Sequence, residues 1–398
     1  MRILISTWSL QIGGGEVLAM NLAAELVKRG HQVVIFNQRD ELIDQDLVER
    51  LLPPEVQVRS MADKPWQRFW AHKVNALQGR LGRPAVFYEE SQQTYLKECL
   101  VRHRIELISS HATFSDRLCA PVAQQLRLPL VITEHGEYSR FVLEGRRDFA
   151  AVLHSASRIL TVSKYNQQVL QGAFTDLPPV QTVYNGVTTD NAHTAAEMRQ
   201  HLGIPREAFV FGLVARGIPE KGWEQATQAF RLFHSLVSDQ QRPARLVLVG
   251  GGEYLQQLQV TCTADADIVF TGQVPNPDFY IAGFDVGLLP TYFQAEALPL
   301  AIIEYMINGK PVIATRIGGI SELLAPATGP VGQLIELDAA TRKPGVVMLA
   351  QAMVRYYTDS ALYARHARHA QEASQQFAMS TCAAHYEDAF QQVLAVSA

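Results

Sequence analysis

Two cations stand five positions apart in a loop that follows an apolar run of the chain. Arg216 and Lys221 come after the predicted strand Phe209–Val214. A guanidinium offers a rigid fork for phosphate oxygens and an ammonium adds a mobile point charge, so such a pair suits a diphosphate leaving group. A basic loop residue is also often merely solvated, and both interpretations stay open for this pair taken alone.

Two carboxylates form a second pattern, with seven mostly apolar residues between them. Glu296 and Glu304 follow the predicted strand Asp285–Leu289. Pro299 suits the first turn of a helix, which predicts Glu296 in the preceding loop and Glu304 about two turns along the helix. Glu304 has apolar neighbours, so an unpaired charge there would be costly and a partner is expected.

This pattern of carboxylates suits a nucleotide-linked sugar. Glu296 at the helix mouth is expected to accept hydrogen bonds from sugar hydroxyls, whereas Glu304 is expected to reach a ribose. The backbone between the two glutamates is expected to face the diphosphate, at Leu298, Pro299 and Leu300. Because helix N-termini favour anions, this segment complements the two cations.

Three glycines follow the first predicted strand, Arg2–Thr7. Gly13, Gly14 and Gly15 precede a predicted helix over residues 17–29, a layout in which backbone N–H groups can approach a phosphate. The spacing of these glycines does not supply the third glycine of the dinucleotide-binding fingerprint G-x-G-x-x-G, and no acidic residue ends the second predicted strand. NAD binding is therefore disfavoured. A ligand contact at Gly14 and Gly15 and a purely structural turn both stay open.

Short β-rich runs alternate with longer helical patterns along the whole chain, which is typical of βαβ units. In the first half we expect strands at Arg2–Thr7, Gln32–Phe36, Leu107–Ser110, Leu130–Thr133, Arg158–Val162 and Gln181–Tyr184. In the second half we expect them at Phe209–Val214, Arg245–Val249, Ile268–Phe270, Asp285–Leu289 and Val312–Ala314. The predicted class is therefore α/β, with two successive doubly wound sheets.

The 398 residues of the chain exceed what one hydrophobic core usually holds, so two domains are expected. The first is predicted over residues 1–190 and the second over residues 191–379. A final helix over residues 380–398 is a candidate to complete the first domain. Ligands of such sheets bind beyond the carboxyl ends of the strands, and a central cleft between two Rossmann-like domains would face both sets of ends.

These motifs resemble those of the retaining GT-B glycosyltransferases often called group 1. Arg216 and Lys221 match the family's Arg-x4-Lys pair, and Glu296 with Glu304 match its E-x7-E motif. Further similar segments run in the same order along essentially the whole chain, at residues 13–16, 161–163, 183–187, 308–315 and 318–322. The chain departs from many members at residues 297–299, where Ala-Leu-Pro stands in place of Gly-Phe-Gly.

The resemblance implies the GT-B fold and sugar transfer with retention of configuration, without a covalent enzyme intermediate. It implies a nucleotide-diphosphate sugar as donor and a glycan or lipid-linked acceptor, as in cell-envelope polysaccharide or glycolipid synthesis. It makes His111, after the strand Leu107–Ser110, the candidate for the family's active-site histidine near the transferred sugar. His135 also follows a strand and is an acceptor-site candidate, together with Glu134 and Glu137.

No resident cofactor or metal is expected. Asp265 and Asp267 resemble the metal-holding DxD of the other glycosyltransferase fold, but they begin a predicted strand instead of ending one. This position predicts a solvated turn. The leaving diphosphate would then be neutralised by Arg216, Lys221 and helix dipoles instead of Mg²⁺.

The segment Lys64–Arg83 carries five cations, no acid and three aromatic residues. Its apolar members recur at helical spacing, at Trp66, Trp70, Val74, Leu77 and Leu81. A basic amphipathic helix of this kind can lie on an anionic membrane and collect a lipid-linked acceptor. The alternative, an ordinary helix that packs this stripe into its own domain, stays open.

The composition limits which binding partners and which cellular compartment are expected for the protein. The net charge of −4 divides into +2 for the first 186 residues and −6 for the rest, too weak a basic balance for nucleic acid. The four cysteines are scattered, without a CxxC pair, so neither a zinc site nor a disulfide framework is expected. No signal peptide or spanning segment is predicted. We expect a cytoplasmic protein, with peripheral attachment to the inner face of a membrane as an option.

Two other function classes stay open at this point. One is a nucleotide-sugar epimerase or a phosphorylase built on the same paired domains. The other is a non-catalytic sugar-binding protein of two α/β lobes, against which the missing signal peptide counts.

Overall fold

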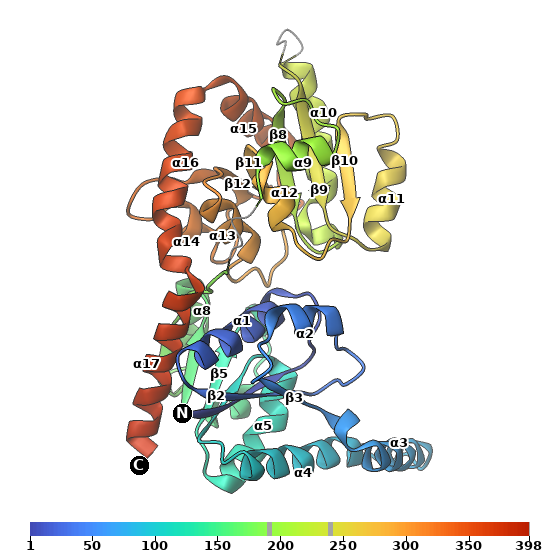
Figure 1. The fold of residues 1–398 in the computed structure, drawn as a ribbon, viewed down its shortest axis with the longest axis vertical. Helices are drawn as coiled ribbons and strands as arrows, with labels where there is room; N and C mark the ends of the chain where they lie inside the picture. The colour runs from blue at the N-terminus through green and yellow to red at the C-terminus, as the bar shows by residue number, and fades with distance from the viewer. Residues whose placement is uncertain (189–192, 238–241, 398) are drawn as a thin grey trace. The chain divides into compact units, whose positions relative to one another are not determined.

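The computed structural model describes residues 1–188, 193–237 and 242–397. The chain divides into two compact units, one formed by Met1–Gly186 with Met379–Ala398 and one by Val187–Ala378 (Figure 1). The domain boundary predicted between residues 190 and 191 lies outside the described residues. The α/β class predicted from the sequence is confirmed, because each unit is built on a parallel sheet flanked by helices.

The first unit contains a seven-stranded sheet in the order β3-β2-β1-β4-β5-β6-β7. Neighbouring strands pair in parallel, with β1 at the centre between β2 and β4. The strands are β1 Arg2–Thr7, β2 Gln32–Asn37, β3 Gln57–Arg59, β4 Leu107–Ser110, β5 Leu130–Glu134, β6 Arg158–Thr161 and β7 Val180–Thr182. This doubly wound order brings the loops after β1, β4 and β5 to one edge of the sheet.

Several helices of the first unit cover this sheet with apolar side chains. The helices of this unit are α1 Gly14–Lys28, α2 Gln45–Leu51, η1 Met61–Asp63, α3 Pro65–Arg80, α4 Phe87–Arg102, α5 Thr113–Leu126, α6 Glu137–Leu143, α7 Ala150–His154, α8 Lys164–Ala173 and α17 Met379–Ser397. In α1, Leu18, Leu22 and Leu26 recur every four residues and are fully buried. The C-terminal helix α17 packs against α1 and adds Tyr386 and Phe390 to the same core.

The second unit contains a six-stranded parallel sheet in the order β10-β9-β8-β11-β12-β13. Its strands are β8 Phe209–Val214, β9 Ala244–Val249, β10 Ile268–Gly272, β11 Val286–Leu289, β12 Val312–Thr315 and β13 Gly332–Ile335. Its helices are α9 Ala195–His201, η2 Pro219–Lys221, α10 Trp223–Leu236, α11 Glu253–Thr261, α12 Asp278–Ala282, α13 Leu300–Ile307, α14 Ile320–Leu324, α15 Val346–Thr358, α16 Ser360–Ser374 and η3 Gln375–Phe377. Strands β8 and β11 are neighbours, so the loops that follow them lie side by side.

The strands predicted from the sequence are present, with ends displaced by at most two residues. Strands β3 and β13, each at one edge of its sheet, were not predicted from the sequence. Both are mostly half-buried or exposed, so neither contains the continuous apolar run that marks a central parallel strand. Within the three described ranges, no helix is long and apolar enough to cross a bilayer.

Candidate functional site

The loop after β8 brings Lys221 into the interior of the second unit. A one-turn 3₁₀ helix, η2, carries Lys221, and the Trp223 indole N–H anchors the loop by donating to the Arg216 carbonyl at 3.1 Å. The Lys221 ammonium then donates to the Glu296 carboxylate at 2.6 Å. The two sequence motifs, each identified separately, therefore meet in one ion pair.

This ion pair is almost completely removed from water. Lys221 is 8% exposed and Glu296 is 6% exposed. The fully buried Thr291 hydroxyl also donates to the Glu296 carboxylate, at 3.0 Å. Removing one member of a buried pair typically costs about 3–5 kcal/mol, because the other charge is left without compensation. Each charge therefore fixes the position of the other.

Close backbone approaches hold the loops after β8 and β11 together. Gly222 has φ +79°, and a Cβ there would stand 2.0 Å from the Pro290 carbonyl oxygen. The Tyr292 N–H donates to the Glu220 carbonyl at 2.8 Å. Gly318, with φ +54°, lies so close to the Glu296 carbonyl that no side chain fits. Glycine is thus required at positions 222 and 318.

The Phe293 ring contacts both predicted phosphate-binding cations. The Arg216 guanidinium carbon is 5.6 Å from the centre of the ring, and the Lys221 ammonium is 5.0 Å from it. Both distances fall within the range of cation–π attraction. Arg216 itself is exposed, so its side chain can meet an incoming anion. Phe293 and Thr291 were not predicted from the sequence, because neither belongs to a spacing pattern.

Glu304 lies on α13, which begins at Leu300 directly after Pro299. Glu304 is therefore about one turn into the helix, and the prediction of about two turns was wrong because residues 296–299 all precede the helix. Leu298 and Pro299 precede the helix and Leu300 is its first residue, and the contact of this segment with the diphosphate stays a prediction.

Glu304 is half-buried, and the described residues give its carboxylate no hydrogen bond or ion pair. Burial, followed by the charge of Asp278, raises the pKa of Glu304 to about 8. The partner expected for Glu304 is thus not supplied by the described protein. The arrangement leaves an acceptor group available for a ligand hydroxyl.

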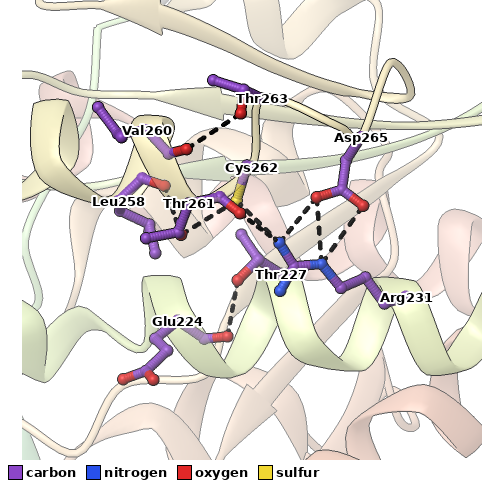
Figure 2. A network of polar contacts seen from close by, with 9 residues as sticks. All are labelled: Glu224, Thr227, Arg231, Leu258, Val260, Thr261, Cys262, Thr263 and Asp265. Carbon is purple, nitrogen blue, oxygen red and sulfur yellow. Dashed lines mark hydrogen bonds and ion pairs between the residues drawn. The ribbon is translucent and has the colours of Figure 1, made fainter.

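The two aspartates of the DxD-like segment are held by arginines. Asp265 pairs with Arg231 of α10 at 2.7 Å (Figure 2), and Asp267 pairs with Arg245 of β9 at 2.6 Å. The interpretation of this segment as a merely solvated turn was therefore incomplete. Within residues 1–188, 193–237 and 242–397, no three His, Cys, Asp or Glu side chains form a group suited to a metal ion.

In the first unit, His111 and His135 meet at the carboxyl ends of β4 and β5. The His111 Nδ1 is 3.3 Å from the His135 Nε2, and the His111 Nε2 is 3.0 Å from the Ser109 hydroxyl. On its other side, the His111 ring stacks on Tyr386 of α17 at 6.0 Å. The C-terminal helix thus supports the histidine, a contribution that the sequence analysis missed.

Both histidines are neutral at pH 7. Burial lowers the pKa of His135 to about 4. Burial, and then the neighbouring His135, holds the pKa of His111 well below its usual range. A neutral imidazole can donate one hydrogen bond and accept another, so this pair suits hydroxyl groups better than phosphate.

The glycine segment lies beside these histidines. A Cβ on Gly15 would stand 3.4 Å from the His135 ring, whereas Gly14 is exposed and has open space around it. Helix α1 begins at Gly14. The N-terminal end of α1 therefore lies close to His135.

The two glutamates predicted near His135 have other partners. The buried Glu134 carboxylate accepts the backbone N–H groups of Tyr138 and Ser139, at 3.1 and 2.8 Å, and so caps α6. Glu137 pairs with Arg140 one turn along α6. The Glu134 carboxylate is therefore occupied by the N–H groups at the start of α6, whereas the side chain of Glu137 is partly exposed.

Comparisons with known proteins agree with this architecture. The family model described as Glycosyltransferase Family 4 matches residues 12–191, and the model described as Glycosyl transferases group 1 matches residues 194–340. In fold, the chain is similar to Anabaena HepE, crystallised in complex with UDP and glucose, with a TM-score of 0.76 and 21% identity over 98% of this chain and 99% of that chain.

Two relatives show the sequence similarity of this chain to named enzymes. A putative teichuronic acid biosynthesis glycosyltransferase of Bacillus subtilis is 32% identical over 228 residues, a match that spans 55% of each protein. The N-acetyl-alpha-D-glucosaminyl L-malate synthase of Bacillus anthracis is 24% identical over 410 residues, covering 96% of this chain and 95% of that protein.

The two doubly wound parallel sheets define a GT-B glycosyltransferase fold. The two adjacent family matches together span most of the chain. The chain belongs to the group 1 glycosyltransferases.

The raised pKa of Glu304 predicts a pH-dependent stability. Its folded pKa of about 8 lies above its ordinary value, so stability is lost as pH rises from the ordinary carboxyl pKa through about 8. Glu304→Gln has no proton to lose. Relative to the wild type, its free energy of unfolding should rise by at least about 1 kcal/mol between pH ~5.5 and pH ~9, measured by urea titration.

Glu207→Gln is the matched control, because Glu207 is an exposed carboxylate of the same unit. Its stability difference from the wild type should stay constant over the same pH interval. The same constant difference for Glu304→Gln would show that Glu304 titrates normally and would remove the argument for an unsatisfied carboxylate.

Proposed function

We propose that this chain is a retaining glycosyltransferase that moves a sugar from a nucleotide-diphosphate sugar to a glycan or lipid-linked acceptor. The observation that carries the proposal is the buried Lys221–Glu296 pair, with Arg216 close by and a Glu304 carboxylate that has no partner among the described residues. These groups match the parts of such a donor: a diphosphate, a sugar and a ribose. The second unit is thus the donor-binding unit.

Arg216 and Lys221 are assigned to the diphosphate. Arg216 is exposed and can meet the donor first, whereas Lys221 is held in place by Glu296, whose carboxylate also accepts the Thr291 hydroxyl. A donor phosphate would share the Lys221 ammonium with Glu296. The Glu296 carboxylate then faces the sugar hydroxyls, and ligand binding does not require either charge to be left alone.

We also propose that the configuration at the anomeric carbon is retained, without a covalent intermediate between the sugar and the enzyme. The bond between the anomeric carbon and the leaving phosphate oxygen breaks while a bond to the acceptor oxygen forms on the same face. The acceptor proton passes to the departing phosphate, whose negative charge Arg216 and Lys221 stabilise. The neutral His111 is assigned to a hydroxyl of the transferred sugar, which would take the place of Ser109 or His135 at one of the two ring nitrogens.

The acceptor is assigned to the first unit. His135 and Glu137 are its candidate ligands, with Gly14 and Gly15 beside them. The teichuronic acid relative supports a cell-envelope polysaccharide or glycolipid as the product class. The four cysteines are all buried and unpaired, which suits a reducing compartment, so we place the reaction in the cytoplasm. Family membership favours transfer over epimerisation, phosphorolysis or non-catalytic sugar binding.

Substitution of Glu304 and substitution of Glu296 should impair different properties, nucleotide binding in the first case and the transfer rate in the second. Glu304→Gln should weaken binding of donor and of free nucleoside diphosphate by about ten- to 150-fold at pH ~8.5, the loss of a charged hydrogen bond to the ribose. Glu296→Gln should lower the transfer rate while leaving nucleoside diphosphate affinity equal or higher, because Lys221 then has no competing carboxylate.

Calorimetric titration of both variants with nucleoside diphosphate, beside initial rates with the intact donor, measures this difference. The wild type should also gain affinity as pH rises through about 8, since the ionised Glu304 carboxylate accepts a stronger hydrogen bond from a hydroxyl than the protonated form does. Glu304→Gln is the control that should lack this pH dependence. Wild-type nucleotide affinity in Glu304→Gln would contradict the ribose assignment.

Turnover should need no divalent metal. The charge on the leaving diphosphate is assigned to Arg216, Lys221 and the N-terminal end of α13, while Asp265 and Asp267 are paired with arginines. Initial rates with and without EDTA should be equal. Loss of activity in EDTA, restored by Mn²⁺ or Mg²⁺, would refute this part of the proposal.

A further inference from the structure

Helix α3 presents its large apolar side chains to solvent. Trp66 is 78% exposed and Trp70 is 61% exposed, and Leu77 and Leu81 are exposed as well. In α3 only Ala71 is fully buried. The alternative that this stripe packs into its own domain is therefore wrong for these four side chains, although Val74 is half-buried.

The opposite face of α3 is polar and is fixed to the protein. The Lys64 ammonium pairs with Glu98 of α4 at 2.8 Å, and Arg68 pairs with the buried Asp40 carboxylate at 2.8 Å. Asn75 accepts the N–H of Tyr88, in the first turn of α4, at 2.9 Å. Helices α3 and α4 lie side by side (Figure 1). These contacts hold α3 with its polar face inward and its apolar face outward.

Three cations accompany the exposed apolar side chains. Trp66, Trp70, Lys73 and Leu77 follow one another at spacings of four, three and four residues, so they share one face of the helix. Arg80 continues that face and Arg83 follows the helix end. Across the described ranges, no ion pair is formed by Lys73, Arg80 or Arg83, in contrast to Lys64 and Arg68. The cations left without acidic partners are thus on the outer side.

We propose that this outer face of α3 docks the chain on an anionic lipid bilayer. The indoles of Trp66 and Trp70 enter the boundary between headgroups and acyl chains, as amphipathic rings prefer, and Leu77 and Leu81 deepen the contact. Lys73, Arg80 and Arg83 meet the lipid phosphates. Residues 64–83 contain no acid, so no carboxylate of this segment offsets the attraction of Lys73, Arg80 and Arg83 to an anionic membrane.

A bilayer explains the outward apolar face better than a second copy of the chain. A second copy would place Lys73, Arg80 and Arg83 opposite the same three cations, and like charges brought together destabilise an interface. The membrane surface extends the proposed function by bringing lipid-linked acceptors within reach, but docking itself requires neither donor nor acceptor. Its test is therefore independent of sugar transfer.

The test is flotation of the full chain with vesicles of phosphatidylcholine, with and without phosphatidylglycerol, at low and high salt. The wild type should float with the anionic vesicles at low salt and detach as salt is added. Each cation near such a surface is worth about fivefold in partitioning, so the triple variant Lys73→Gln, Arg80→Gln, Arg83→Gln should bind roughly a hundredfold more weakly. Trp66→Ser with Trp70→Ser should also lose binding.

Leu236→Ser with Val260→Ser is the matched control, because both side chains are exposed and belong to the second unit. This variant should float like the wild type, and circular dichroism should show all variants folded. Brominated acyl chains should quench the fluorescence of the wild type but not of the Trp66 and Trp70 variant.

Three results would overturn the proposal. The first is no flotation of the wild type at low salt, and the second is equal flotation with neutral vesicles. The third is a lipid-free dimer of the wild type that becomes monomeric in the Trp66 and Trp70 variant, which would assign this face to a second copy.

Discussion

Lys221 and Glu296 are buried as one ion pair, and the arrangement of the candidate site in the second unit depends on that pair. Neither charge could occupy the interior alone without a large cost. The pair therefore ties the loop after β8 to the loop after β11, and Thr291 adds a hydrogen bond to the same carboxylate. Gly222 and Gly318 permit the close backbone approach that the pair requires. The two loops thus hold charged groups in position before any ligand arrives, which lowers the reorganisation needed in a transition state.

Both units use the same physical rule for placing chemistry. Parallel strands deliver their following loops to one edge of the sheet, and the helices that begin there present N–H groups toward that edge. In the second unit this rule gathers Arg216, Lys221 and Glu296. In the first it gathers His111, His135 and Gly15, with Tyr386 from α17 behind the His111 ring.

The central strands and the two charged motifs could be predicted from the sequence, because buried parallel strands are continuous apolar runs and the motifs follow them directly. The ion pair between the motifs could not be predicted, since it depends on β8 and β11 being neighbours. Phe293 and Thr291 carry no spacing signal, and the capping role of Glu134 depends on where α6 begins. The outward orientation of α3 was also beyond the sequence, because helical spacing defines a stripe but not the side that faces water.

The central claim is that a nucleoside diphosphate binds at the Lys221–Glu296 pair. Hydrogen exchange of the full chain tests it most directly, measured with and without UDP, GDP, ADP and dTDP, with binding of each verified by calorimetry. A nucleotide that binds should slow exchange at residues 216–222 and 291–304, where the cations and both glutamates lie. Unchanged exchange in both segments at saturating nucleotide, or no binding of any of the four, would contradict it.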